Sequence, residues 1–413
     1  MSGLTNSLNA ELLQLSNEAR RKHPEIKEAA ERSIYILRTL KERPGMDITQ
    51  ELAKNVDFLR PFLLACETRH AKLITISIGS IQKLISHHAI PESSVKTILK
   101  TLNDIISQGV EVQLKILQTL PPLLNNYSTL TGDLLVEGLL VCFRLQDSKI
   151  MAVNNTAAAT LRQLVINIFD KVEKEDEIIE KNAGSIKPTS TVVSVHGHGE
   201  IALRPCARDA YFLFQDLCLL TNLEPATFLR LNALPRTFGL ELIESVLTNH
   251  LRLFKKHPEF LSVLRERICP LIIKTFSDKH DFPQTMRLMR VVYILIKQFS
   301  EILVTECEIF LAMFIKILEP ENPLWQRVIA MEIFRGVCGG DGVFLRSIYR
   351  WYDRQDNSTN VFRDMINVFG RLAAEKPQVV GVSSVVGQIH HQSLENSDVT
   401  GVNSLGADAP GLS

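Results

Sequence analysis

The chain has 413 residues, 45% of them hydrophobic and 22% charged, so it is long enough for two or three domains with large buried cores. Lysine plus arginine and aspartate plus glutamate each total 46, which excludes an overall charge that would attract nucleic acid. The seven cysteines are never closer than twelve residues, which excludes a CxxC motif and zinc-type spacing and indicates buried thiols in a reducing compartment.

The sequence shows no signal for secretion or membrane insertion. Polar residues such as Asn6, Asn9 and Glu11 interrupt the N-terminus where a signal peptide would have its apolar core. The longest apolar run, around residues 73–85, is shorter than the roughly 20 residues that span a bilayer. We therefore expect a cytosolic chain that reaches membranes only by recruitment.

The first elements are two amphipathic helices. From Leu4 to Arg21 apolar residues recur at helical spacing, and a basic run follows before Pro24. This helix could lie on a membrane surface, but it lacks the Trp and Phe expected there, so we expect it to pack as the first element of its domain. A second helix is predicted from Glu25 to Arg43, ending at Pro44.

Residues 61–85 form a predicted helical hairpin with a polar break at residues 67–70. In the second helix, one apolar stripe within about 60° is predicted to face the core; it contains Ile74, Ile78, Ile81 and Ile85. The opposite face carries two cations beside an apolar side chain and a glycine, namely Lys72, Ile76, Gly79 and Lys83. If only the residue types are considered, the simplest interpretation is that Ile76 of this second face contacts a neighbouring helix, while the ammonium groups of both lysines lie in water.

The hairpin also resembles the start of the DCB (dimerisation and cyclophilin-binding) domain of the large Arf guanine-nucleotide exchange factors and their Mon-two relatives. The motifs that carry the resemblance are Pro61–Cys66, Thr68-Arg69 and Gln82–Ile85. The resemblance implies Golgi recruitment, possible self-association and binding of an Arf-like small GTPase. Lys72, Ile76, Gly79 and Lys83 are therefore candidate GTPase-binding residues.

Further amphipathic helices are predicted up to Val172, including one over residues 112–124 that Pro121 and Pro122 should cut. Their short links and the lack of strand-type alternation predict an all-α fold, an α-solenoid of HEAT- or armadillo-like hairpins in two consecutive units. Residues 154–169, in which small and amide side chains crowd one end, also resemble the helix that closes the DCB domain. We predict a DCB-like domain over residues 1–174.

Residues 175–200 combine charge, Gly, Pro and Ser/Thr, and are predicted to be a flexible linker. His196 and His198 could bind a metal, but ligands at suitable spacing are absent, so a solvated loop is favoured and no metal site is predicted.

A second helical domain is predicted over residues 201–376, followed by a disordered tail over 377–413. Residues 209–218 resemble the start of the HUS (homology upstream of the catalytic domain) region. Residues 236–245 are more similar to the Mon-two branch than to the active exchange factors.

Near the end of this domain, the sequence resembles the HUS box but departs from it at two positions. Tyr352, Asp353, Asn360 and Phe362 match the family pattern, whereas Trp351 and Arg354 replace its Asn and Cys. If the resemblance is set aside, Asp353 is expected to accept hydrogen bonds from backbone N–H groups in the turn, and Asn360 to cap the next helix. The rings of Tyr352 and Phe362 are expected to pack beneath this turn. A structural role for these residues, which stabilises the turn, is favoured over a role in binding a partner.

The sequence shows none of the common catalytic motifs in a suitable setting, so neither catalytic residues nor cofactors are predicted. By resemblance, we expect a non-catalytic scaffold peripheral to Golgi and endosome membranes, with an Arf-like GTPase and a Dopey-type large protein as partners and no nucleic acid. Two alternatives stay open: the regulatory half of a true exchange factor, and an unrelated HEAT-repeat transport adaptor.

Overall fold

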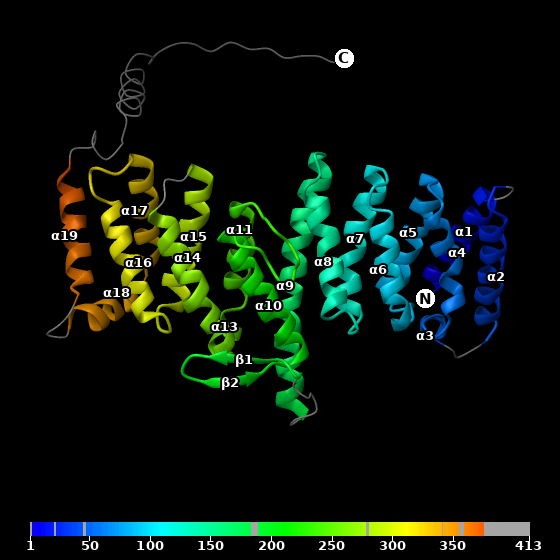
Figure 1. The fold of residues 1–413 in the computed structure, drawn as a ribbon, viewed down its shortest axis with the longest axis horizontal. Helices are drawn as coiled ribbons and strands as arrows, with labels where there is room; N and C mark the ends of the chain where they lie inside the picture. Colours follow the sequence, from blue (N-terminus) through cyan, green and yellow to red (C-terminus); the bar gives the residue numbers. More distant parts are fainter. Residues whose placement is uncertain are drawn as a thin grey trace, which may run out of the picture. The chain divides into compact units, whose positions relative to one another are not determined.

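The computed structural model describes residues 2–19, 22–43, 47–182, 189–277, 281–340, 342–354 and 359–375. Most of these residues are helical, which confirms the all-α prediction (Figure 1). The chain forms two compact units, residues 1–294 and 295–413. The predicted disordered tail, residues 377–413, lies outside the described residues.

The first unit begins as a stack of helical hairpins. Its first elements are α1 (Ser2–Ala19), α2 (Pro24–Lys41), α3 (Ile48–Leu52), η1 (Val56–Leu59), α4 (Arg60–Glu67), α5 (Ala71–Ser86), η2 (Glu92–Ser94), α6 (Val95–Asp104), α7 (Val110–Asn126), α8 (Asp133–Gln146) and α9 (Met151–Asn182). α1 packs on α2 and α5, α5 packs on α7, and α7 and α8 both pack on α9. Each hairpin therefore covers the apolar face of the next, as in an α-solenoid.

The apolar stripes of α1 and α5 are buried as their spacing predicts. Leu8, Leu12 and Leu15 of α1 have no solvent exposure, so this helix packs on its own unit as expected. The four isoleucines of the α5 stripe are also fully buried.

The prediction that Pro121 and Pro122 cut a helix is wrong, because α7 continues through both residues to Asn126. The prolines lie in the last two turns, where the loss of two backbone N–H groups affects few hydrogen bonds. Leu120, Leu123 and Leu124 are buried there. Packing of these leucines stabilises the helix past the prolines.

The predicted flexible linker over residues 175–200 differs from the structure in two places. α9 continues to Asn182, and a two-stranded antiparallel sheet follows, made of β1 (Val192–Val195) and β2 (Gly199–Ala202). Val192 pairs with Ala202 and Val195 with Gly199. Gly197 and Gly199 have φ angles of 81° and 76°, which suit the tight turn between the strands.

The first unit continues beyond this hairpin. Its remaining elements are α10 (Pro205–Thr221), α11 (Arg236–Asn249), α12 (Leu251–Lys256), α13 (Pro258–Val263), the π-helical turn η3 (Leu264–Ile268), α14 (Cys269–Ser277) and the larger part of α15 (Phe282–Phe299). α9 packs directly on α10 and α11. The compact units divide between residues 294 and 295. The predicted domain bounds, 1–174 and 201–376, remain a prediction.

The second unit contains the end of α15, α16 (Val304–Ile317), α17 (Leu324–Cys338), α18 (Val343–Ile348), the π-helical turn η4 (Tyr349–Asp353) and α19 (Val361–Ala374). α16 packs on α17 and α19. The ring of Phe334 lies 6.1 Å from that of Phe314 and 5.2 Å from that of Phe369, so aromatic contacts join the three helices. None of the helices described in either unit has the length and apolarity needed to cross a bilayer.

Candidate functional site

The lysine-bearing face of α5 lies along α1. Lys72 Nζ is 2.7 Å from a carboxylate oxygen of Glu18, and Lys83 Nζ is 2.5 Å from Glu11 Oε1. Lys83 also donates a hydrogen bond to Ser7 Oγ at 2.6 Å. Both lysines therefore have anionic partners within the chain, whereas the residue-based prediction placed their ammonium groups in water.

Ile76 and Gly79 lie half-buried between these two ion pairs. A methyl group added at Gly79 would meet the ammonium group of Lys115 of α7 at 3.8 Å. No carboxylate of the described residues forms an ion pair with Lys115. The structure thus brings a third cation to this face, which the periodicity of α5 could not predict because Lys115 lies on α7.

The four candidate residues share one face of α5, as their spacing predicts, but they differ in accessibility. The side chains of Lys72 and Lys83 are 57% and 41% exposed, and each holds a carboxylate of α1. Surface ion pairs of this kind contribute about 0–1 kcal/mol. A partner could therefore contact Ile76 and Gly79 directly, and it would have to compete with α1 for the two lysines.

The HUS-box residues join η4 to the start of α19. Asp353 accepts hydrogen bonds from the backbone N–H groups of Phe362 at 2.8 Å and of Arg363 at 2.9 Å. The buried Tyr352 hydroxyl donates to the carbonyl oxygen of Val304 at 2.5 Å, and burial raises the pKa of this phenol. These contacts tie the turn to α16 and satisfy two N–H groups at the N-terminus of α19.

Asn360 does not cap α19 with its side chain, contrary to the prediction. Its backbone adopts a φ of 58°, and its N–H donates to the carbonyl oxygen of Tyr352 at 3.1 Å. Asparagine tolerates this left-handed conformation better than most residues, so its role lies in the turn. Asp353 supplies the cap instead. Phe362 is half-buried, with its ring 5.9 Å from that of Tyr349.

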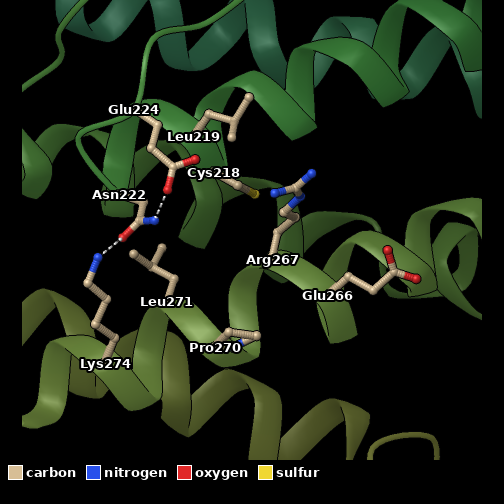
Figure 2. A pocket seen from close by; sticks show the side chains of 9 residues that line it. All are labelled: Cys218, Leu219, Asn222, Glu224, Glu266, Arg267, Pro270, Leu271 and Lys274. Carbon is tan, nitrogen blue, oxygen red and sulfur yellow. Dashed lines mark hydrogen bonds between the residues drawn. The ribbon is translucent and has the colours of Figure 1, made fainter.

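A pocket of about 220 Å³ lies between α10, η3 and α14 (Figure 2). Lys274 Nζ donates to Asn222 Oδ1 at 3.3 Å, and Asn222 in turn donates to the carboxylate of Glu224. Cys218 also lines the pocket, but burial raises the pKa of its thiol. The thiol is therefore protonated at neutral pH and is a poor nucleophile, so this pocket offers polar binding groups rather than an activated cysteine.

An ionic cluster at the end of α9, whose members Asp176, His257 and Glu259 are buried, could not be predicted from the sequence. Asp176 forms ion pairs with Arg204, with His257 Nε2 at 2.9 Å and with Lys256 Nζ at 3.0 Å. The other ring nitrogen of His257 lies 2.8 Å from Glu259 Oε1. We call these five residues the Asp176 cluster. It holds the end of α9 against the chain that enters α10 and against the start of α13.

The charges of the Asp176 cluster determine the protonation of its members. Burial alone would raise the pKa of Asp176, but hydrogen bonds from His257, Arg204 and Lys256 lower it to about 2. Burial likewise opposes the charged form of His257, but hydrogen bonds to Glu259 and Asp176 raise the pKa of its imidazole. Both shifts favour the charged form, so the cluster stabilises a carboxylate at Asp176 and an imidazolium at His257.

The histidines considered as metal ligands lie apart from such clusters. His196 and His198 are exposed in the turn between β1 and β2. The buried His250 has acidic neighbours on α9, with Nδ1 3.2 Å from Glu173 and Nε2 3.8 Å from Asp170. These contacts link α9 to the end of α11 through the His250 ring.

Comparison with protein families gives two consecutive matches. A model described as the Mon2/Sec7/BIG1-like dimerisation and cyclophilin-binding (DCB) domain matches residues 1–176. A second model, described as the Mon2/Sec7/BIG1-like HUS domain, matches residues 206–361. The Asp176 cluster thus joins the end of the first match to the second.

Known relatives agree with these matches. Protein MON2 homolog of Homo sapiens is 38% identical over 391 residues, which cover 89% of this chain and 22% of that protein. The homologue of Xenopus laevis is 37% identical over 387 residues, with the same coverage. Protein MON2 of Saccharomyces cerevisiae is 30% identical over 379 residues, or 87% of this chain and 22% of that protein. The chain spans about a fifth of the length of these relatives, and with both domains in succession it belongs to the Mon2/Sec7/BIG1-like family.

Proposed function

We propose that this chain is a non-catalytic helical scaffold in Golgi–endosome vesicle traffic, which binds an Arf-like small GTPase and large trafficking proteins of the Dopey type. The observation that supports this most is the succession of a DCB and a HUS match, with similarity to Mon2 homologues over 89% of the chain. The same similarity favours this proposal over an unrelated HEAT-repeat adaptor and over the regulatory half of an active exchange factor.

We further propose that the protein is peripheral on Golgi and endosome membranes and reaches them through its partners. The DCB model is named for dimerisation, which supports self-association through residues 1–176. Sedimentation equilibrium of the full chain tests this proposal. A dimer that dissociates on dilution is expected, and a monomer at all concentrations would contradict self-association.

Our candidate site for the GTPase is the face of α5 that carries Lys72, Ile76, Gly79 and Lys83, which we call the α5 face. The γ-phosphate orders the switch regions of a GTPase, so a domain that recognises the GTP-bound state needs an apolar patch with a few charges around it. Ile76 and Gly79 supply a small apolar surface, and Lys115 supplies a cation with no carboxylate partner among the described residues. Lys72 and Lys83 border this surface and at the same time hold α1 in place.

Ile76→Glu tests this site without mutating any residue of the two ion pairs. Capture of a GTP-locked Arf-like GTPase by the variant is expected to fall by on the order of tenfold or more, because a carboxylate replaces the apolar contact. Tyr35→Glu is the matched control, since Tyr35 is 72% exposed on α2. Circular dichroism should show both variants to be folded. Equal capture by wild type and Ile76→Glu would place the GTPase site elsewhere.

A further inference from the structure

A groove of about 440 Å³ in the second unit combines arginines with an apolar floor. It lies between α18, η4 and the start of α19, and its lining residues are Leu345, Arg346, Tyr349, Arg350, Arg354 and Phe362. Its volume falls within the range of sites that bind small ligands or peptide side chains. All six residues belong to one compact unit.

The floor of the groove exposes apolar surface to water. Tyr349 is 51% exposed, and its ring meets that of Phe362 at 5.9 Å in an edge-to-face arrangement. One turn further along α19, Ile366 is 48% exposed. Neighbouring aromatic and aliphatic side chains that are left open together are typical of a surface that a partner covers.

The arginines of the groove differ from the other arginines of this unit. Residues 295–413 contain seven arginines. Four of them pair with carboxylates: Arg327 with Glu375, Arg335 with Glu332, Arg363 with Asp364 and Arg371 with Glu319. Within the described chain, no ion pair or side-chain hydrogen bond is formed by Arg346, Arg350 or Arg354. The three unpaired arginines all line the groove.

Among the described residues, the carboxylate of Asp353 forms no ion pair with these arginines and accepts the N–H groups of Phe362 and Arg363. The groove therefore holds three guanidinium groups that are exposed to solvent beside an apolar floor. A guanidinium group offers a planar fork of N–H donors that matches a carboxylate with two hydrogen bonds. The complementary ligand is thus an anion that also carries apolar groups.

We propose that this groove binds an acidic segment of a partner protein. The apolar side chains of that segment contact Tyr349 and Phe362, and its carboxylates pair with Arg346, Arg350 and Arg354. A peptide fits better than a bilayer surface because the apolar groups line a recess, which a side chain can fill. The site lies in a different unit from the α5 face and shares no residue with it.

An array of twelve-residue peptides tests the proposal. Each peptide combines Asp or Glu with Leu, Phe or Trp, and each has a counterpart in which Lys replaces the acidic residues. The full chain is expected to bind members of the acidic set and not their counterparts. For the tightest peptide, fluorescence anisotropy should show an affinity loss on the order of tenfold for Arg350→Glu. Arg350→Lys should lose less, since it keeps the charge but not the planar fork.

Arg335→Glu is the matched control, because it makes the same charge change in the same unit at a side chain that is 79% exposed outside this groove. Its affinity for the peptide should equal that of wild type. The proposal is overturned if no acidic peptide binds, or if Arg335→Glu weakens binding as much as Arg350→Glu. It is also overturned if phosphatidylserine vesicles bind through Arg350 while the peptides do not, which would make the groove a lipid site.

Discussion

The carboxylate of Asp176 accepts a hydrogen bond from Nε2 of His257 at 2.9 Å, between residues that are 81 positions apart in the sequence. Both residues are buried, and Arg204 and Lys256 pair with the same carboxylate. The contact therefore holds the end of α9 on the start of α13. It lies where the DCB match ends and where the sequence predicts a flexible linker.

Replacing Asp176 by Ala should lower the free energy of unfolding by about 3–5 kcal/mol. The substitution leaves Arg204 and His257 without their shared counter-charge in a buried setting. Urea unfolding followed by circular dichroism measures the change. Glu177→Ala is the control, because the Glu177 side chain is 65% exposed and should contribute less than about 0.5 kcal/mol. Equal losses for the two variants would show that the cluster does not stabilise the fold.

The same cluster predicts a dependence of stability on pH. The pKa of His257 is raised in the folded state, so its contribution to stability is fully present below pH 6.5 and is lost as pH rises through the raised value. The wild-type melting temperature should therefore fall between pH 6 and pH 9 by more than that of His257→Gln. If the melting temperatures of the two proteins fall by the same amount over this pH range, the imidazolium of His257 does not stabilise the fold.

Asp176 acts in the opposite direction, at acidic pH. Its pKa is lowered to about 2 in the folded state, so its contribution is present above pH 4 and is lost as pH falls towards 2. Between pH 4 and pH 2, the free energy of unfolding should therefore decrease more for wild type than for Asp176→Asn. Identical acid profiles would contradict an ionised, paired Asp176.

The sequence predicted features that depend on local periodicity. The isoleucine stripe of α5 follows from a 3.6-residue repeat, and the structure buries it. The helix break at Pro121 was wrong because contacts with other helices outweigh the local cost of two prolines. The β1–β2 hairpin was also missed, although Thr191–Val195 is rich in β-branched residues and precedes two glycines in a turn.

Contacts between distant residues left no signal in a single sequence. The partners of Asp176 lie 28 and 81 residues away, at Arg204 and His257. Lys83 likewise pairs with Glu11 across 72 residues, so a lysine expected in solvent holds another helix. Periodicity predicts which face of a helix is apolar, but it does not predict which charges meet across helices.

The Lys83 ion pair predicts a result for charge reversal. Lys83→Glu places a carboxylate beside Glu11 and should lower the free energy of unfolding by roughly 1 kcal/mol. The double variant Lys83→Glu/Glu11→Lys restores opposite charges and should recover most of that loss. A double-mutant cycle with no coupling energy would mean that the pair does not hold α1 on α5.

Asp353→Ala should lower the free energy of unfolding by about 1–3 kcal/mol, because the N–H groups of Phe362 and Arg363 lose their acceptor. Asp353→Asn keeps one acceptor oxygen and should cost less. Asp364→Ala, at an exposed position in the first turn of α19, is the control and should change stability by less than about 1 kcal/mol. If Asp353→Ala leaves thermal stability unchanged but abolishes binding of a partner, the HUS-box residues form an interaction surface.

The most direct test of a GTPase-binding scaffold is the equilibrium affinity of the full chain for Arf-like GTPases in two nucleotide states. Biolayer interferometry with immobilised chain compares GTP-locked and GDP-locked forms of the same GTPase. We expect the GTP-locked form to bind at least tenfold more tightly, because only that form presents ordered switch regions. Equal affinity for both states, or no saturable binding by any Arf-like GTPase, would contradict the account.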